Sequence, residues 1–393
     1  RESLAFQIHQ PERSYRHSEL IVDSSQSISL RPHQKPAVTA LLESKVGIYQ
    51  APPGSGKTVT ALETARRAGL RTLILVDKVS IADQWISRAQ QFLNTDLTVG
   101  KIADGVFQIE DFTVATKQTL YSRREQLKED GFFEHWGMVI VDECHHIQAD
   151  SYQRVIQEFD SEYLLGLSAT PHKIPGMEKA VNFMIGDIIH VTTEEELQDQ
   201  NILQKPKVFL EYTDFEFEYK TWVWGGKQRN NYQTLLKNLV SDEKRNSQIA
   251  DALIEAESRK VLVITKRLNH IQNIKKLLPK ELEEKTYILT GKESREEREE
   301  ILENLNSESS YIVFSTIADE ALDIPSLDTL FLIFPAKQEG LIIQQLGRIE
   351  RYSKGKKAPI VIDFVDSKCS LLSNQSYSRY KVYTQKKLNI LVS

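Results

Sequence analysis

Residues 51–58 read Ala-Pro-Pro-Gly-Ser-Gly-Lys-Thr, and this short glycine-rich string constrains the fold of the 393-residue chain more than any other feature. The backbone N–H groups of such a loop can surround phosphate oxygens, with Lys57 reaching the β- and γ-phosphates and the Thr58 hydroxyl available to Mg²⁺. The alternative is an ordinary turn between a strand and a helix, in which the glycines serve only to adopt positive φ. Ala51 stands where the strictest form of the loop begins with glycine.

A second string supplies the acidic groups that phosphate chemistry needs. Residues 137–141 form an apolar, β-branched run, typical of a buried parallel strand, that ends in Asp142 and Glu143. We expect Asp142 to hold Mg²⁺ together with Thr58, and Glu143 to polarise the attacking water. The two strings together predict hydrolysis of ATP. The residues expected to hold its phosphates are Pro53, Gly54, Ser55, Gly56, Lys57 and Thr58.

Composition limits the compartment and the partners. No apolar run approaches the ~18 residues of a membrane span, and we expect neither a signal peptide nor a membrane partner. Cys144 and Cys369 are the only cysteines, which indicates a reducing compartment: the cytoplasm of a bacterial or phage-infected cell, with the nucleus as the alternative. The net charge of −5 does not advertise a nucleic-acid binder. It does not exclude one, since phosphate contacts need only a local basic surface.

Short apolar runs alternate with helical stretches in two successive series, the pattern of parallel sheets covered on both faces. The first series covers residues 73–76, 112–115, 137–141 and 163–167, and the second covers residues 260–264, 287–289, 311–314, 329–333 and 359–362. The second series contains no phosphate loop of its own. We expect an N-terminal extension that remains from a longer segment (1–27), two doubly wound α/β domains (28–205 and 206–376) and a basic, aromatic C-terminal tail (377–393).

The order of the motifs resembles that of the superfamily 2 helicases and translocases, from about residue 28 to residue 365. Residues 30–34 are similar to the adenine-recognition motif, so Gln34 would read the base edge and Arg31 would stack on its face. Residues 142–145 form the acidic box in its DECH spelling. Residues 344–351 match the last motif, QxxGRxxR, which implies that Gln344, Arg348 and Arg351 act on the nucleotide, the two arginines as arginine fingers.

The resemblance implies two tandem RecA-like domains with ATP in the cleft between them, and ATP and Mg²⁺ as cofactors. Ser168, Ala169 and Thr170 would couple hydrolysis to movement, and Asp323 would contact the nucleotide, although Ala321 replaces the usual glycine nearby. The residues implied in gripping the nucleic-acid backbone are Lys78, Gln84, Thr116, Thr265, Lys266, Lys292 and Thr316. For the threonines, the alternative is an ordinary role as caps or ladder residues at strand ends.

The form of the last motif is closest to XPB-, UvsW- and type III restriction-type motors, and especially to phage branch-migration helicases. We therefore expect a monomeric DNA helicase or translocase that acts on forked or branched DNA without reading its sequence, in replication, recombination or repair. An RNA helicase is one alternative, because nothing in the sequence reports on the 2′-hydroxyl. The motor of a restriction system or of a nucleic-acid sensor is another.

Two segments lie outside the shared motifs. Residues 219–229 have the pattern of a hairpin with Gly225-Gly226 at its turn, inserted near 213–230. Its Trp222 and Trp224 would stack on bases as a wedge at a duplex junction, or would pack against the adjoining domain. Residues 377–387 mix tyrosines with lysines and an arginine, and would form either a helix closing on the first domain or a basic tail on DNA.

Overall fold

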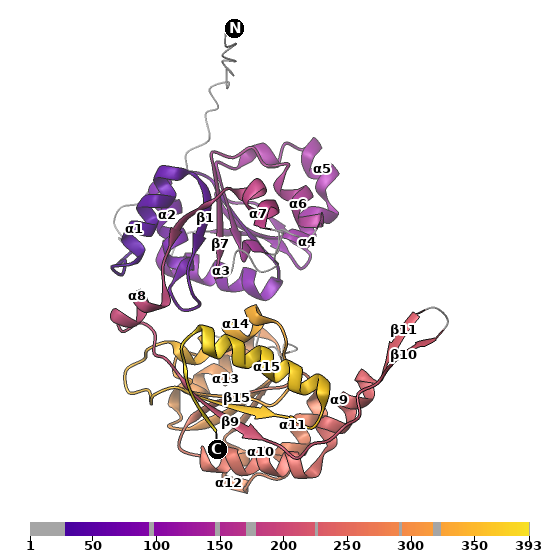
Figure 1. Ribbon diagram of the computed structural model, residues 1–393. Coiled ribbons are helices and arrows are strands. Elements are labelled where there is room, and N and C mark those ends of the chain that lie inside the picture. The colour runs from indigo at the N-terminus through magenta and orange to yellow at the C-terminus, as the bar shows by residue number, and fades with distance from the viewer. Residues whose placement is uncertain are drawn as a thin grey trace, which may run out of the picture. The chain divides into compact units, whose positions relative to one another are not determined.

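The computed structural model describes residues 28–93, 98–145, 150–169, 178–224, 227–290, 293–316 and 324–392. The chain divides into two compact units, residues 1–193 and residues 194–393, and Figure 1 shows an α/β sheet in each. Among the described residues, no helix is long and apolar enough to span a membrane.

The first unit alternates strands and helices along the chain. Its strands are β1 (Val46–Gln50), β2 (Thr72–Val76), β3 (Val99–Ala103), β4 (Val106–Gln108), β5 (Phe112–Thr116), β6 (Met138–Asp142), β7 (Tyr163–Ser168) and β8 (Ile188–Val191). Its helices are α1 (Gln34–Ser44), α2 (Lys57–Ala68), α3 (Val79–Phe92), α4 (Lys117–Ser122), α5 (Arg124–Glu129), α6 (Asp150–Ile156) and α7 (Glu178–Ile185), with a 3₁₀ turn at Phe133–His135. The strands form one sheet in the order β4-β3-β5-β2-β6-β7-β1-β8, parallel except for the β3–β4 pair.

Alternation along each strand builds a core on both faces of this sheet. In β6, Met138 and Ile140 belong to one buried cluster and Val139 and Val141 to another, because successive side chains of a strand point to opposite faces. The first cluster includes residues of α1, α2 and α3, and the second includes residues of α4 to α7. This is why the strands read as continuous apolar runs in the sequence.

The second unit repeats the scheme. Its strands are β9 (Lys207–Tyr212), β12 (Lys260–Ile264), β13 (Thr286–Leu289), β14 (Tyr311–Ser315), β15 (Thr329–Leu332), β16 (Ile360–Val365) and β17 (Asn389–Val392), in the parallel order β13-β14-β12-β15-β16-β9-β17. Its helices are α8 (Glu194–Asp199), α9 (Tyr232–Ser241), α10 (Glu243–Glu255), α11 (Leu268–Lys275), α12 (Lys280–Glu284), α13 (Arg295–Ser307), α14 (Glu339–Glu350) and α15 (Ser370–Gln385).

Every apolar run named from the sequence is a strand of one of these sheets, but two expected boundaries differ. The units separate after Thr193, not after residue 205, because residues 202–204 form backbone hydrogen bonds with residues 350–352 of the second unit. Residues 377–393 are not a tail. They complete α15 and supply β17, which pairs with β9, because the buried Arg379 and Tyr383 hold the carboxylate of Asp363 on β16.

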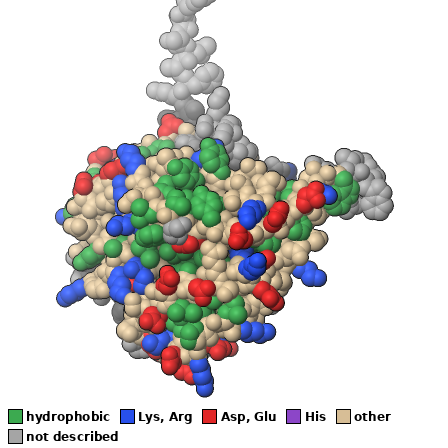
Figure 2. All heavy atoms as spheres, turned by 60° about the horizontal axis from the view of Figure 1, so that its bottom comes forward, with side chains coloured by type: hydrophobic (Ala, Val, Ile, Leu, Met, Phe, Trp, Pro, Cys, Tyr) green, Lys and Arg blue, Asp and Glu red, His purple; other side chains and the backbone are tan. Residues whose placement is uncertain are grey.

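The hairpin consists of β10 (Thr221–Trp224) and β11 (Lys227–Asn230), antiparallel, with Trp224 opposite Lys227. Figure 1 shows it extending away from the sheet of the second unit. Trp222 is 46% exposed, so it is not a core residue. The side chain of Trp224 and the turn residues lie outside the described part of the chain. On the face in Figure 2, basic and acidic side chains are interspersed, consistent with the small net charge.

Candidate functional site

Three neighbouring strands of the first sheet end at the same edge and deliver the residues that the sequence singled out. The phosphate loop leaves β1 after Gln50, Ser168 ends β7, and Asp142 ends β6. Gln50 pairs with Ser168 and Asp142 pairs with Leu167, so the three strand ends lie level with one another. The carboxyl edge of a parallel α/β sheet is where such folds bind ligands.

The phosphate loop is shaped by glycine and followed at once by a helix. Gly54 and Gly56 have φ of 82° and 84°, and α2 begins at Lys57. A Cβ on Gly56 would lie 2.5 Å from Nε2 of Gln34. The first N–H groups of a helix lack partners inside it and favour anions. In this structure Nζ of Lys57 donates to the carbonyl of Ala51 at 3.0 Å, so the cation lies against its own loop.

Residues 31–34 lie behind this loop and are joined to it by hydrogen bonds. Nε2 of the buried Gln34 donates to the carbonyl of Gly56 at 3.2 Å, and Nε2 of His33 lies 2.8 Å from the carbonyl of Ser55. Oε1 of Gln34 accepts from the backbone N–H of Arg31 at 2.9 Å, while the Arg31 side chain is exposed. The structure thus ties residues 31–34, which are expected to recognise adenine, to the phosphate loop, a link that the sequence alone did not reveal.

Asp142 is held by two donors. Nε1 of Trp85 donates to Oδ2 at 2.8 Å and the backbone N–H of Glu143 donates to Oδ1 at 2.9 Å. Desolvation raises the pKa of Asp142 to about 6, the charge of Glu143 adds to that rise, and the hydrogen bond from Trp85 opposes it. Glu143 has φ of 45°, a strained value for a residue with a side chain and one that recurs at functional sites.

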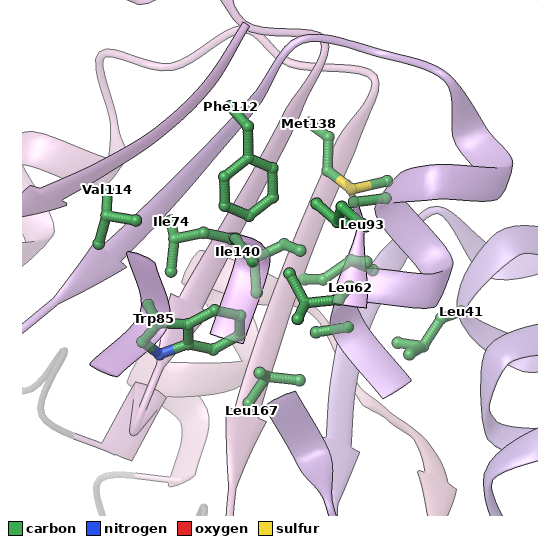
Figure 3. Packing of buried hydrophobic residues seen from close by; sticks show 14 of the residues in the cluster. Leu41, Leu62, Ile74, Trp85, Leu93, Phe112, Val114, Met138, Ile140 and Leu167 are labelled. Carbon is green, nitrogen blue, oxygen red and sulfur yellow. The ribbon is translucent and has the colours of Figure 1, made fainter. Parts of the chain in front are cut away.

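Trp85 contacts Asp142 although the sequence assigned it no role of its own, whereas the adjacent Gln84 was expected to contact nucleic acid. Gln84 is exposed. Trp85 is 2% exposed, and Figure 3 shows its ring among Ile74, Ile140 and Leu167. One signal for this contact was present: Trp85 lies on the helix that follows β2, and β2 lies next to β6, the strand that ends in Asp142.

A second link joins Glu143 to the coupling motif. Nδ1 of the buried His145 lies 3.2 Å from Oε2 of Glu143 and 3.0 Å from Oγ of Ser168. His145 therefore connects the residue expected to polarise water with the end of β7. Ala169 follows directly, and Thr170 lies outside the described residues. The sequence placed His145 in the acidic box but did not assign it a role.

The residues present fit ATP with Mg²⁺. Oγ of Ser55 is buried in the loop and has no hydrogen-bond partner in the described part of the chain, as expected of a group that faces a ligand. Thr58 and Asp142 offer the hard oxygen donors that Mg²⁺ prefers. No group of three His, Cys, Asp or Glu side chains suited to a metal occurs among the described residues. The ion would therefore depend on phosphate oxygens and water for its other ligands.

The threonines expected to grip nucleic acid are engaged inside their own domains. Oγ1 of the fully buried Thr265 lies 3.1 Å from Nδ1 of His270, and its N–H donates to the carbonyl of Ser315. Thr316 donates through Oγ1 to the carbonyl of Thr290 at 3.2 Å.

Oγ1 of Thr116 lies 2.8 Å from that of Thr119. These three hydroxyls thus have partners inside their own domains at strand ends, and their contact with phosphates stays a prediction. Lys78 and Lys266 are exposed beside the ends of β2 and β12.

The last motif lies on α14 and just beyond it. Gln344 and Arg348 are half-buried on that helix, which ends at Glu350, so Arg351 is its C-cap residue with extended φ and ψ of −62° and 133°. Arg348 and Arg351 therefore do not both lie within the helix. Lys292 and Asp323 lie outside the described residues.

Comparisons with known proteins fit this arrangement. Residues 27–173 match the family model described as the type III restriction enzyme, res subunit, and residues 244–353 match the helicase conserved C-terminal domain. The chain is 29% identical over 376 residues to the DNA 3′-5′ translocase XPB2 of Sulfurisphaera tokodaii, covering 86% of this chain and 82% of that protein.

Two solved structures share the fold at 14% identity. The ATP-dependent type ISP restriction-modification enzyme LlaBIII bound to DNA has a TM-score of 0.69, with 93% of this chain and 31% of that one covered. Saccharomyces cerevisiae Dbp5 bound to RNA and ADP BeF3 has a TM-score of 0.65, with 92% and 89% covered. These likenesses confirm the expected fold of two tandem RecA-like domains.

Proposed function

Because this chain belongs to the superfamily 2 helicases and is therefore an ATPase, we propose that it couples ATP hydrolysis to movement along DNA. The observation that carries the proposal is the convergence at three strand ends of the phosphate loop, of Asp142 held by Trp85, and of Glu143 linked through His145 to Ser168. Binding, metal coordination and water activation each have a residue there. The likeness to a translocase that acts on DNA favours DNA over RNA.

The positions of the residues support the following roles. N–H groups at the start of α2 and the Lys57 ammonium neutralise phosphate charge, Thr58 and Asp142 hold Mg²⁺, and Glu143 accepts the proton of the attacking water. Gln344, Arg348 and Arg351 approach the nucleotide from the second unit when the units close on ATP. An arginine at the γ-phosphoryl contributes about 10³–10⁵ to the rate in related hydrolases, so opening switches hydrolysis off.

Contact with DNA is directed to the backbone. The exposed Lys78 and Lys266 stand beside strand ends in the two units, where each can hold a phosphate without reading the base. Alternating closure and opening then moves one unit at a time along the strand, as a monomer. An RNA helicase is the second candidate, since such contacts do not depend on the sugar.

The finer proposal is that the enzyme works where a duplex opens, on forked or branched DNA. The hairpin of β10 and β11 supports it, because Trp222 exposes an aromatic face on an element that extends from the second unit. Such a face can stack on a base.

The test compares ATP hydrolysis and strand separation on single-stranded, duplex, forked and four-way DNA, and on RNA. We expect DNA to stimulate hydrolysis more than RNA does, and forked or four-way DNA to be unwound. Glu143→Gln should keep ATP and DNA binding while lowering kcat by at least about 10²-fold. Stimulation by RNA alone would contradict the DNA assignment, and normal turnover of Glu143→Gln would remove Glu143 from its role.

A further inference from the structure

The segment that enters the second unit lies against the C-terminal end of α14. The chain passes from one unit to the other between Thr193 and Glu194. Shortly afterwards, the N–H of Gln204 donates to the carbonyl of Glu350 at 2.7 Å, and the N–H of Tyr352 donates to the carbonyl of Ile202 at 2.9 Å. Between them, Leu203 and Arg351 form an antiparallel bridge. The entering segment therefore holds the backbone on both sides of Arg351.

A buried charge cluster makes a second connection between the same two parts. Lys386, at the end of α15, has a side chain only 8% exposed. Its Nζ pairs with the carboxylate of Glu194, the first residue of α8, and lies 3.2 Å from Oε1 of Glu350, the last residue of α14. The Glu350 side chain is 5% exposed. One ammonium thus joins the point where the chain enters the unit to the residue before Arg351.

A second lysine, Lys356, binds the backbone carbonyls at the end of α14. Nζ of Lys356 donates to the carbonyls of Ile349 and Arg351 at 2.7 and 2.6 Å. Lys356 and Glu350 are both withdrawn from water, and this burial lowers the pKa of Lys356 to about 8 and raises that of Glu350 to about 7. Lys386 pairs with Glu194 and Glu350 at the same time, and separating one partner of a buried ion pair leaves the other charge without a partner. Because keeping both pairs avoids this cost, we expect α8 and the end of α14 to shift together.

We propose that Lys386 is a positioning residue for Arg351: by binding both Glu194 and Glu350, it makes the placement of the arginine depend on the connection between the two units. This inference rests on the proposed function, since it takes Arg351 to act on the nucleotide. Displacement of the connection, as the units open, would then move Arg351 away from its working position. A placement error of 1 Å can cost about 10²-fold in rate.

The test uses the full chain and begins with Glu194→Gln. This change keeps the size of the side chain and removes its charge, and the Glu194 side chain is 26% exposed, so the unit should still fold. The matched control is Glu195→Gln, whose carboxylate is 65% exposed and 4.0 Å from the exposed Lys387. With DNA saturating, we expect Glu194→Gln to lower kcat for ATP by about tenfold, inside the range that small misplacement produces, with KM nearly unchanged. The control should match the unaltered enzyme.

Two further variants separate positioning from simple stabilisation. Lys386→Arg keeps a cation that can bind both carboxylates and should retain most of kcat, whereas Lys386→Met should lose it. In an Arg351→Ala background, Glu194→Gln should lower kcat no further, because its effect passes through the arginine.

Each contrary result has a distinct meaning. Additive losses in the double variant, or a fall in kcat that only follows a lower thermal midpoint and folded fraction, would overturn the positioning role. A normal kcat for Glu194→Gln and Lys386→Met beside an impaired Arg351→Ala would also overturn it while leaving the proposed function standing. A normal kcat for Arg351→Ala would instead remove the arginine finger from the proposed function, and this inference with it.

Discussion

At the scale of single residues, the contact between Trp85 and Asp142 is a supporting interaction that should control metal binding. Trp85→Phe keeps a buried ring but removes the donor to Oδ2. Loss of a residue that orients a metal ligand typically costs about 10–100-fold in metal affinity or activity. We expect the Mg²⁺ concentration for half-maximal hydrolysis to rise accordingly.

The control for this prediction is Trp136→Phe. Trp136 is a fully buried tryptophan of the same unit, and its Nε1 has no hydrogen-bond partner among the described residues. The substitution removes the same atoms without removing a hydrogen bond. Equal Mg²⁺ dependence in the two variants would show that the contact of Trp85 with Asp142 has no role in metal binding.

His270 should make the stability of the second unit sensitive to acid. Burial and the charge of Arg245 lower its pKa to about 3, from an ordinary value of 6.5. Between these values the unfolded chain binds a proton that the folded chain does not, so the free energy of unfolding falls as the pH drops below 6.5. The slope from this group is about 1.4 kcal/mol per pH unit.

The measurement is urea unfolding of the unaltered protein and of His270→Gln from pH 7.5 to pH 5. We expect the variant to be less stable at neutral pH, because contacts with Thr265 and Asn246 change, but to lose less stability on acidification. Parallel curves for the two proteins would contradict the prediction, because they would mean that the pKa of His270 is nearly the same in the folded and the unfolded chain.

At the scale of elements, we expect α15 to stabilise the second unit, because it packs into the buried core of that unit. Its Arg379 is 3% exposed and pairs with Asp363 on β16 through Nε and Nη2, the latter at 2.6 Å from Oδ1. Arg379→Met leaves the carboxylate buried without its cation, which costs about 3–5 kcal/mol. The expected result is a large fall in the thermal midpoint.

Lys381→Met, on the exposed side of the same helix, should leave that midpoint unchanged. A removable basic tail would behave differently, because both substitutions would then weaken DNA binding and neither would alter stability.

The hairpin of β10 and β11 offers a direct test of the proposed wedge. If Trp222 and Trp224 stack on bases where the duplex opens, replacing both with alanine should abolish strand separation while most DNA-stimulated hydrolysis and the melting temperature are retained. Removal of a core tryptophan instead costs about 3–5 kcal/mol. A large drop in melting temperature would therefore show that the pair packs against protein, and the wedge should be abandoned.

At the scale of the whole molecule, a chain with a net charge of −5 must bind DNA through a local surface. Affinity should fall with added salt and vary little with base sequence, because counterions are released from the contacted phosphates. Lys266→Met should reduce the salt slope by about 0.7–1, the contribution of one phosphate.

The control is Lys280→Met. That exposed lysine begins α12, the helix that leads into the amino end of β13, so it should not contact the DNA that Lys266 contacts. Equal salt slopes for the two variants, or sequence-selective binding that survives high salt, would contradict the assignment.

Much of the fold followed from local patterns. Apolar runs buried on both faces predicted strands such as 260–264, because hydrophobic alternation is lost only where both faces are covered. The edge strand β17 and its neighbour β9 were not predicted, since both have partly exposed residues and therefore a weaker apolar signal. The C-terminal segment was misjudged for a related reason: Arg379 is apparent as a core residue only when Asp363 is opposite it.

What the sequence determined by itself was the chemistry of the first unit. The phosphate loop and the Asp142-Glu143 pair are encoded in short strings, because glycine backbone freedom and adjacent carboxylates are properties of neighbouring residues. Only the tertiary structure decided which distant side chains contact these residues. Trp85 reaches Asp142 from 57 positions away, His145 joins Glu143 to Ser168, and Lys386 joins Glu194 to Glu350 across 192 and 36 positions. Such contacts depend on the order of strands in a sheet and on the packing of helices, which no local pattern specifies.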